Sequence, residues 1–235
     1  MANDEPLIRD FGQRLCEALA GPLPGLEAQL RMAPRPRTGW DPSRLPADLR
    51  DAAALVLIYP GADQTPPSSG AMRLHLPLTV RGAALRNHTG QVSLPGGRVD
   101  AGESFETAAL REAAEEVGIA PASVRVLGRL TPLHIPVSRY LLHPIVGLAD
   151  ARPAFSAAEW EVARILEVPV AHLADPAVVR RETQLRERDG HMVEIDVPYF
   201  DVDGERVWGA TAMVLAEFLA ILEGLEGWRL GGVEG

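Results

Sequence analysis

The sequence predicts an α/β protein in which helices cover a mixed sheet. Residues 53–59 (AALVLIY) form a continuous apolar run, which is typical of a strand buried on both faces. Residues 104–117 have a helical pattern that ends at Gly118. Asp189-Gly190 separates two strand-like segments and indicates a hairpin. Because strands and helices are interspersed without a regular repeat, we expect one mixed sheet with helices on its faces.

The remaining elements are assigned in chain order from the same signals. Residues 5–31 have an apolar helical rhythm that is broken at Gly21-Pro22 and again at Pro24. Residues 32–46 contain four prolines and are expected to form an extended connector. Further strands are predicted at 73–81, 92–94, 124–130, 140–148, 178–187 and 192–200, and a closing amphipathic helix at 210–225.

Length and composition limit the organisation and the function. A chain of 235 residues fits one domain with an extension, so we expect a helical extension and connector over 1–50, a main domain over 51–226 and a tail over 227–235. The formal charge of -9 argues against a non-specific nucleic-acid partner, which needs a basic surface. The sequence contains no lysine, so a Schiff-base mechanism is excluded.

Targeting and redox signals are absent from the sequence. Cys16 is the only cysteine, so no intramolecular disulfide and no cysteine zinc cluster can form. The first ten residues, MANDEPLIRD, are acidic and lack an apolar segment, and no apolar run approaches the roughly 20 residues of a membrane span. We therefore expect a cytoplasmic protein without a membrane partner, and a homodimer remains open.

Three glutamates form the most informative group. On a helix, Glu112, Glu115 and Glu116 are at i, i+3 and i+4 and lie on one face, where their charges repel. A divalent cation removes that repulsion, and oxygen ligands suit Mg²⁺ or Mn²⁺ rather than zinc. The alternative interpretation is a solvated acidic helix face.

The residues before the helix favour the metal site. Gly96-Gly97 allows a tight backbone turn that brings carbonyl oxygens close to the helix. Glu103 and Arg111 are spaced so that the loop can fold back and pair with the helix. Such a pair would fix the loop over the carboxylate face.

This segment resembles the Nudix box, G-x5-E-x7-R-E-U-x-E-E-x-G-U, in which U is a bulky apolar residue. The resemblance implies an α/β/α sandwich and metal-dependent hydrolysis of a nucleoside diphosphate linked to another group. It also implies a structural role for Glu103 and Arg111. One U position holds the smaller Ala113, which we attribute to repacking under the helix. Matching positions are Gly97, Glu103, Arg111, Glu112, Glu115, Glu116, Gly118 and Ile119, and the implied metal ligands are Glu112, Glu115, Glu116 and the loop backbone at Gly97.

The preceding residues resemble the signature of the coenzyme A diphosphatase subfamily of Nudix hydrolases. The matching string runs from Leu78 to Gly97 and includes Arg81, Arg86 and His88. The resemblance implies that the substrate is coenzyme A or one of its thioesters. Positive groups there could hold phosphates beside the metal face, although His88 could equally be a structural residue.

The implied mechanism is metal-assisted attack of water on a phosphorus of the pyrophosphate. A carboxylate must accept the proton of that water, and Glu112, Glu116 and Glu161 are the candidates. Glu161 is included because Nudix enzymes often bring an acidic residue from a later segment to the metal. Two other functions remain open: a Nudix hydrolase of another substrate such as ADP-ribose or NADH, and a nucleotide-sensing module without turnover.

Overall fold

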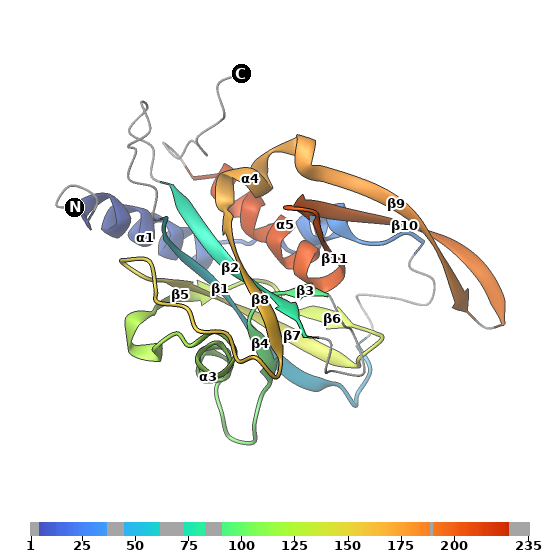
Figure 1. Ribbon diagram of the computed structural model, residues 1–235, viewed down its shortest axis with the longest axis horizontal. Helices are drawn as coiled ribbons and strands as arrows, with labels where there is room; N and C mark the ends of the chain where they lie inside the picture. The colour runs from blue at the N-terminus through green and yellow to red at the C-terminus, as the bar shows by residue number, and fades with distance from the viewer. Residues whose placement is uncertain (1–4, 37–44, 62–72, 83–90, 189, 226–235) are drawn as a thin grey trace.

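The computed structural model describes residues 5–36, 45–61, 73–82, 91–188 and 190–225 (Figure 1). Within these residues an eight-stranded mixed sheet has helices on both faces, and three further strands form a second sheet. The predicted α/β class is therefore confirmed. The elements in chain order are α1 (Glu5–Ala20), α2 (Gly25–Gln29), η1 (Leu30–Met32), β1 (Arg50–Pro60), β2 (Leu74–Arg81), β3 (Val92–Ser93), β4 (Gly96–Arg98), α3 (Phe105–Val117), η2 (Pro121–Ser123), β5 (Arg125–Arg129), β6 (Leu133–Ile135), β7 (Tyr140–Leu148), β8 (Val162–Pro169), α4 (Val170–Ala174), η3 (Pro176–Val178), β9 (Val179–Arg188), β10 (His191–Val202), β11 (Glu205–Trp208) and α5 (Gly209–Glu223).

Strand β1 organises the large sheet. It pairs in parallel with β7 along nine residues, from Arg50 opposite Tyr140 to Ile58 opposite Leu148. On its other edge β1 pairs antiparallel first with β4 and then with β2. Strand β8 adds to the far edge of β2, also antiparallel. This order places β4, β2 and β8 on the same side of β1.

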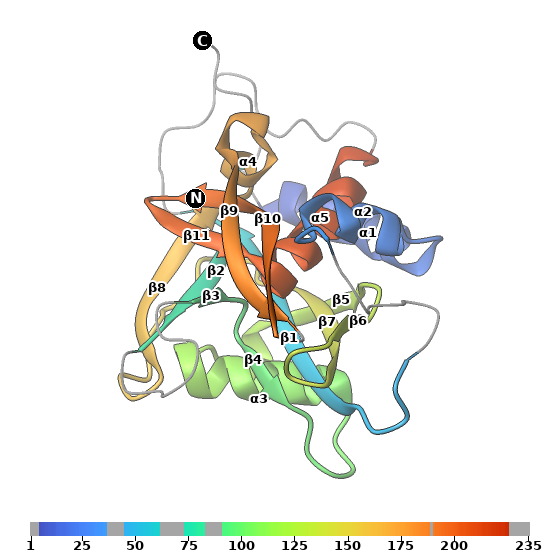
Figure 2. The ribbon, with the colours of Figure 1, turned by 90° about the vertical axis from the view of Figure 1, so that its right-hand side faces the viewer.

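The two faces of β1 serve two separate apolar clusters. Leu55 and Leu57 pack toward α3, whereas Val56 and Ile58 pack into the larger cluster with α1 and α5. All four side chains are completely buried. Each such burial stabilises the fold by roughly 1.5–3 kcal/mol, which explains the uninterrupted apolar run in the sequence. Figure 2 shows α3 below the sheet and the α1 and α5 layer above it.

Helix α3 begins and ends where the sequence signals predict. The Ser104 side chain accepts a hydrogen bond from the Thr107 N–H at 3.1 Å and caps the first turn. Gly118 follows the last turn with φ of 74°, a left-handed conformation that favours glycine. The helix packs on the sheet through small and apolar side chains, including Ala113 and Val117. Glu116 is also buried on this helix, whereas Glu115 is exposed.

The N-terminal segment shares the main core. Ile8, Phe11 and Leu15 of α1 lie in the same apolar cluster as α5 and the sheet. The division at residue 50 between extension and main domain stays a prediction. None of the helices in the described ranges is both long and apolar enough to cross a membrane.

The second sheet contains the predicted hairpin. β9 and β10 pair antiparallel up to Arg188 opposite His191, and β11 adds to the other edge of β10. The sequence interpretation did not separate these strands from the main sheet. It also missed β4, β6 and β8. Strand β8 mixes buried and exposed residues without regular alternation or a continuous apolar run, and β4 and β6 have only three residues each, so none gives a strong strand signal.

Candidate active site

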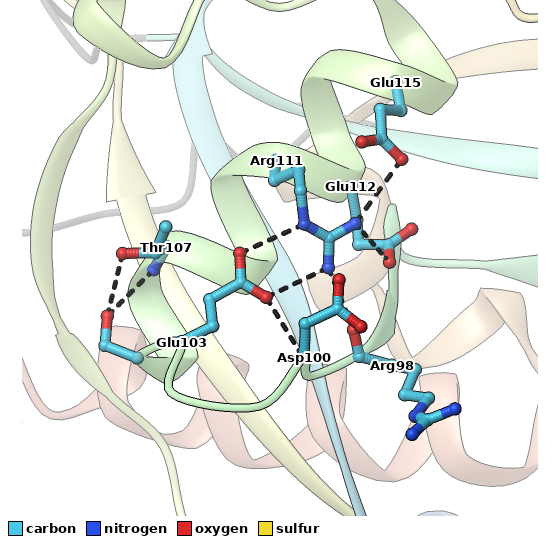
Figure 3. Close-up of polar contacts among 8 residues, drawn as sticks. Arg98, Asp100, Glu103, Thr107, Arg111, Glu112 and Glu115 are labelled. Atoms are coloured by element: carbon cyan, nitrogen blue, oxygen red, sulfur yellow. Dashed lines mark hydrogen bonds and ion pairs between the residues drawn. The ribbon is translucent and has the colours of Figure 1, made fainter.

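The loop before α3 is tied to the helix by a two-pronged ion pair (Figure 3). Arg111 donates from Nε to Glu103 Oε1 at 3.0 Å and from Nη2 to Glu103 Oε2 at 3.1 Å. The Asp100 N–H also donates to Glu103, and Arg111 Nη2 donates to the carbonyl of Arg98. The hydrogen bonds from Arg111 hold the pKa of Glu103 below its usual range. The loop-to-helix pair expected from the spacing is therefore present.

Arg111 also contacts two of the predicted metal ligands. Its Nη1 donates to Glu112 Oε1 at 2.9 Å and to Glu115 Oε2 at 3.4 Å (Figure 3). The bond to Glu103, followed by the bond to Glu112, raises the pKa of Arg111, so the guanidinium stays charged. Because Arg111 joins the loop anchor to these carboxylates, it partly neutralises the acidic helix face.

Glu116 is the buried member of the acidic group. Only 4% of the residue is exposed, and its Oε2 accepts a hydrogen bond from the Gly96 N–H at 3.1 Å. Burial, opposed by the hydrogen bond from Gly96 and aided by the charges of Glu161 and Glu112, raises the pKa of Glu116 to about 8. Near neutral pH, the Glu116 carboxyl is therefore ionised only when a nearby positive charge offsets the cost of its burial.

Glu112 lies directly against the glycine pair. A Cβ atom added at Gly97 would be 2.5 Å from Glu112 Cδ, and one added at Gly96 would be 2.4 Å from the carbonyl oxygen of Ala53. Burial is the main reason that the pKa of Glu112 is raised. The expected tight turn at these glycines is wrong, because both lie in β4. Glycine is needed because the strand is pressed between β1 and the Glu112 carboxylate.

Glu161 reaches the same group from a distant segment of the chain. Its charge raises the pKa values of both Glu112 and Glu116, which places the three carboxylates within electrostatic range of one another. Arg81 at the end of β2 donates from Nη2 to Glu161 Oε1 at 2.9 Å, and the Gly82 N–H donates to the Glu161 carbonyl. The pairing of β2 with β8 thus brings Arg81 and Glu161 together.

The sequence named both residues but did not predict that they form a pair. Arg81 was expected to contact substrate, and Glu161 to approach the metal. No local pattern could have shown their contact, because it depends on the register between two strands far apart in the sequence. Arg86 and His88 lie outside the described residues.

Comparison with known proteins identifies the family. The sequence model of the NUDIX domain matches residues 68–188, just over half of the chain. The chain belongs to the Nudix family. The uncharacterized Nudix hydrolase NudL of Citrobacter koseri is 39% identical over 143 residues, which cover 60% of this chain and 71% of that protein. NudL of Shigella flexneri serotype 5b is 36% identical over 178 residues, covering 74% of this chain and 84% of that protein.

Solved Nudix structures also align with this chain. RenU, a Nudix hydrolase from M. smegmatis, aligns with a TM-score of 0.40 and 23% identity over 54% of this chain and 74% of its own. A MutT/nudix family protein from Enterococcus faecalis aligns with a TM-score of 0.44 and 18% identity over 79% of this chain and 67% of its own. The match to the family model and the NudL relatives make the chain a Nudix hydrolase, a class that acts on nucleoside diphosphate derivatives and generally uses divalent metal ions.

The Nudix box supplies donors of the type that a hard cation needs. Glu112 and Glu116 offer oxygen donors that are at least partly buried and within electrostatic range of each other, and Mg²⁺ prefers oxygen ligands. Among the described residues, no three acidic, histidine or cysteine side chains already surround one point where an ion could bind. Glu115 is 59% exposed and faces Arg111. The chemistry of the donors therefore fits a divalent cation, while the ligand set stays a prediction.

Replacing Glu103 by Gln should lower the melting temperature more clearly than it weakens Mg²⁺ binding. The amide keeps one acceptor but loses the charge and one of the two bonds from Arg111. Thermal melts with and without Mg²⁺ measure both effects. Glu159→Gln, an exposed change outside the box, should leave both unchanged. Unchanged melting together with lost Mg²⁺ binding would show that Glu103 is a metal ligand instead.

Proposed function

We propose that this Nudix hydrolase cleaves the pyrophosphate bond of coenzyme A or its thioesters. The products would be 4′-phosphopantetheine, with its acyl group where present, and adenosine 3′,5′-bisphosphate. One observation carries the proposal. The string that resembles the coenzyme A diphosphatase signature has described residues at both ends that contact the acidic group, since Arg81 pairs with Glu161 and the Gly96 N–H pairs with Glu116.

Glu112, Glu115 and Glu116, with the backbone at Gly97, would hold the divalent cation. When bound, Mg²⁺ would neutralise charge on the diphosphate and lower the pKa of the attacking water. The formal charge of -9 makes such neutralisation necessary, because an anionic substrate must approach an acidic protein.

The chain's own residues would then position the substrate and move one proton. Water attacks one phosphorus, the bond from that phosphorus to the bridging oxygen breaks, and the water proton passes to a carboxylate. Glu161 is the candidate that we favour, because its side chain is 32% exposed against 17% for Glu112, whereas Glu116 is buried. A more exposed carboxylate can pass the proton on to solvent. Arg81 would keep Glu161 in place during this transfer.

A substrate panel with Mg²⁺ tests the proposal. It compares coenzyme A, dephospho-coenzyme A, acetyl-coenzyme A, ADP-ribose and NADH, and records the product masses. We expect cleavage of coenzyme A, with ADP-ribose slower. Removing the 3′-phosphate should lower kcat/KM about 10- to 100-fold, because a hydrogen bond to a charged group contributes roughly 1.5–3 kcal/mol.

Variants of the three positive residues assign that contact. If Arg81, Arg86 or His88 binds the 3′-phosphate, its replacement by Ala should remove most of the difference between coenzyme A and dephospho-coenzyme A. Arg139→Ala is a control, since Arg139 pairs with Asp48 outside this string. A clear preference for ADP-ribose or NADH would overturn the substrate but not the Nudix chemistry. Tight nucleotide binding without turnover would favour a sensing module.

A further inference from the structure

The hairpin of β9 and β10 extends beyond the rest of the described molecule (Figure 1). Its strands pair over ten residues, from Val179 opposite Phe200 to Arg188 opposite His191. Within the described part of the chain, β9 pairs only with β10, whose other edge pairs with β11 at Tyr199–Val202 and with Arg35 at Asp196. The outer edge of β9 therefore presents backbone N–H and C=O groups that another strand can pair with.

The charges along β9 match an antiparallel copy of the same strand. Residues 181–187 have the order Arg-Glu-Thr-Gln-Leu-Arg-Glu. With Gln184 opposite its own copy, Arg181 of each strand lies opposite Glu187 of the other, and Glu182 lies opposite Arg186. Members of each pair are an even number of residues apart, so their side chains share a face of the sheet. This register places four oppositely charged pairs about a two-fold axis.

The neighbouring registers are less favourable. A shift by one residue places Arg181 opposite Arg186 in one direction and Glu182 opposite Glu187 in the other. Like charges directly opposite each other destabilise a strand pair. The charge order therefore disfavours a shift by one residue, while the outermost pair of the two-fold register, Arg180 with Arg188, is like-charged and limits the match to the central residues.

Exposed apolar side chains accompany these charges. Leu185 of β9 and Met192 of β10 are each 62% exposed. They share one face of the hairpin, because Leu185 lies opposite Glu194 and Met192 lies opposite Glu187. In the two-fold register Leu185 would lie opposite Thr183 of the other strand. Contact between Leu185 and that Thr183 would remove apolar surface of Leu185 from water as the strands pair.

We propose that β9 pairs with β9 of a second copy of this chain and joins the two three-stranded sheets into one across a two-fold axis. A two-fold contact uses the same surface on both copies, and the self-complementary charge order of β9 meets this requirement. The inference is independent of the substrate, because the hairpin contributes none of the acidic residues of the candidate active site.

Charge reversal on β9 tests the pairing in the full-length protein. Sedimentation velocity over a concentration series measures the oligomeric state of wild type, Glu187→Arg and Arg181→Glu. Wild type should be a dimer. Each reversal turns two attractive pairs into repulsive ones and should raise the dimer dissociation constant about 10-fold or more. An equal mixture of the two variants should form a heterodimer, since Arg then faces Glu at both positions.

Two controls separate the interface from folding. Glu194→Arg makes the same charge change on the same face but one strand further from the edge, and should leave the dimer intact. Arg181 pairs with Asp196 inside the sheet, so thermal melts check that Arg181→Glu remains folded. Glu182→Arg and Arg186→Glu provide a second complementary set. A monomeric wild type, or a dimer that neither set weakens, would overturn the proposal.

Discussion

Glu116→Gln should reduce kcat at least about 100-fold at saturating Mg²⁺ while the protein remains folded. A charged ligand or proton acceptor commonly contributes a factor of 10² to 10⁴. The fold should tolerate the change, because the amide oxygen can still accept from the Gly96 N–H. Burial raises the pKa of Glu116 to about 8, so the metal-free carboxyl is mostly neutral at pH 7, like the amide that replaces it.

Stability and metal response provide the matching measurements. A raised folded-state pKa means that the Glu116 carboxyl favours folding most at low pH and loses that contribution as pH rises toward 8. In metal-free buffer, the melting temperature of the Gln variant relative to that of wild type should therefore increase as the pH rises toward 8. Mg²⁺ should stabilise wild type more than the variant.

A control for turnover lies on the same helix. Glu106→Gln, where Glu106 pairs with Arg129, should leave turnover near normal. Near-normal turnover by both Glu115→Gln and Glu116→Gln would contradict the metal assignment.

The local parts of this site could be predicted because they depend on short-range geometry. Helical spacing sets Glu112, Glu115 and Glu116 on one face. The loop before the helix folds back and brings Glu103 to Arg111, eight residues later. A close approach of the Gly96-Gly97 backbone to the helix was also predicted, although the structure produces it with a strand rather than a turn and places Gly97 against Glu112. These features need only the helix and the loop that precedes it.

The other parts depend on the sheet and were not predictable. The contact of Arg81 with Glu161 requires the register of β2 against β8, and nothing in either strand specifies its partner. The second sheet was missed for the same reason. Local alternation indicates the β9–β10 hairpin, but whether that hairpin joins the main sheet is decided by long-range pairing.

A buried carboxylate joins the N-terminal segment to the rest of the fold. Glu217 of α5 is completely buried and accepts four hydrogen bonds. Two come from Thr131, through its N–H at 3.2 Å and its hydroxyl at 2.6 Å. The others come from the Gly25 N–H at 3.1 Å and the Gln29 side-chain amide at 2.8 Å. One side chain thus satisfies donors from α2 and from the segment between β5 and β6.

Glu217→Ala should lower the free energy of unfolding by roughly 3–5 kcal/mol, because each buried donor left without an acceptor costs about 1–3 kcal/mol. Urea unfolding measures the loss. Glu217→Gln should have a smaller effect, since the amide retains one acceptor oxygen for the Thr131 hydroxyl and nearby N–H groups. Glu223→Ala, exposed on the same helix, should change stability by no more than about 0.5 kcal/mol. If Glu217→Ala behaves like Glu223→Ala, the N-terminal segment is held by its apolar contacts, and these four hydrogen bonds contribute little.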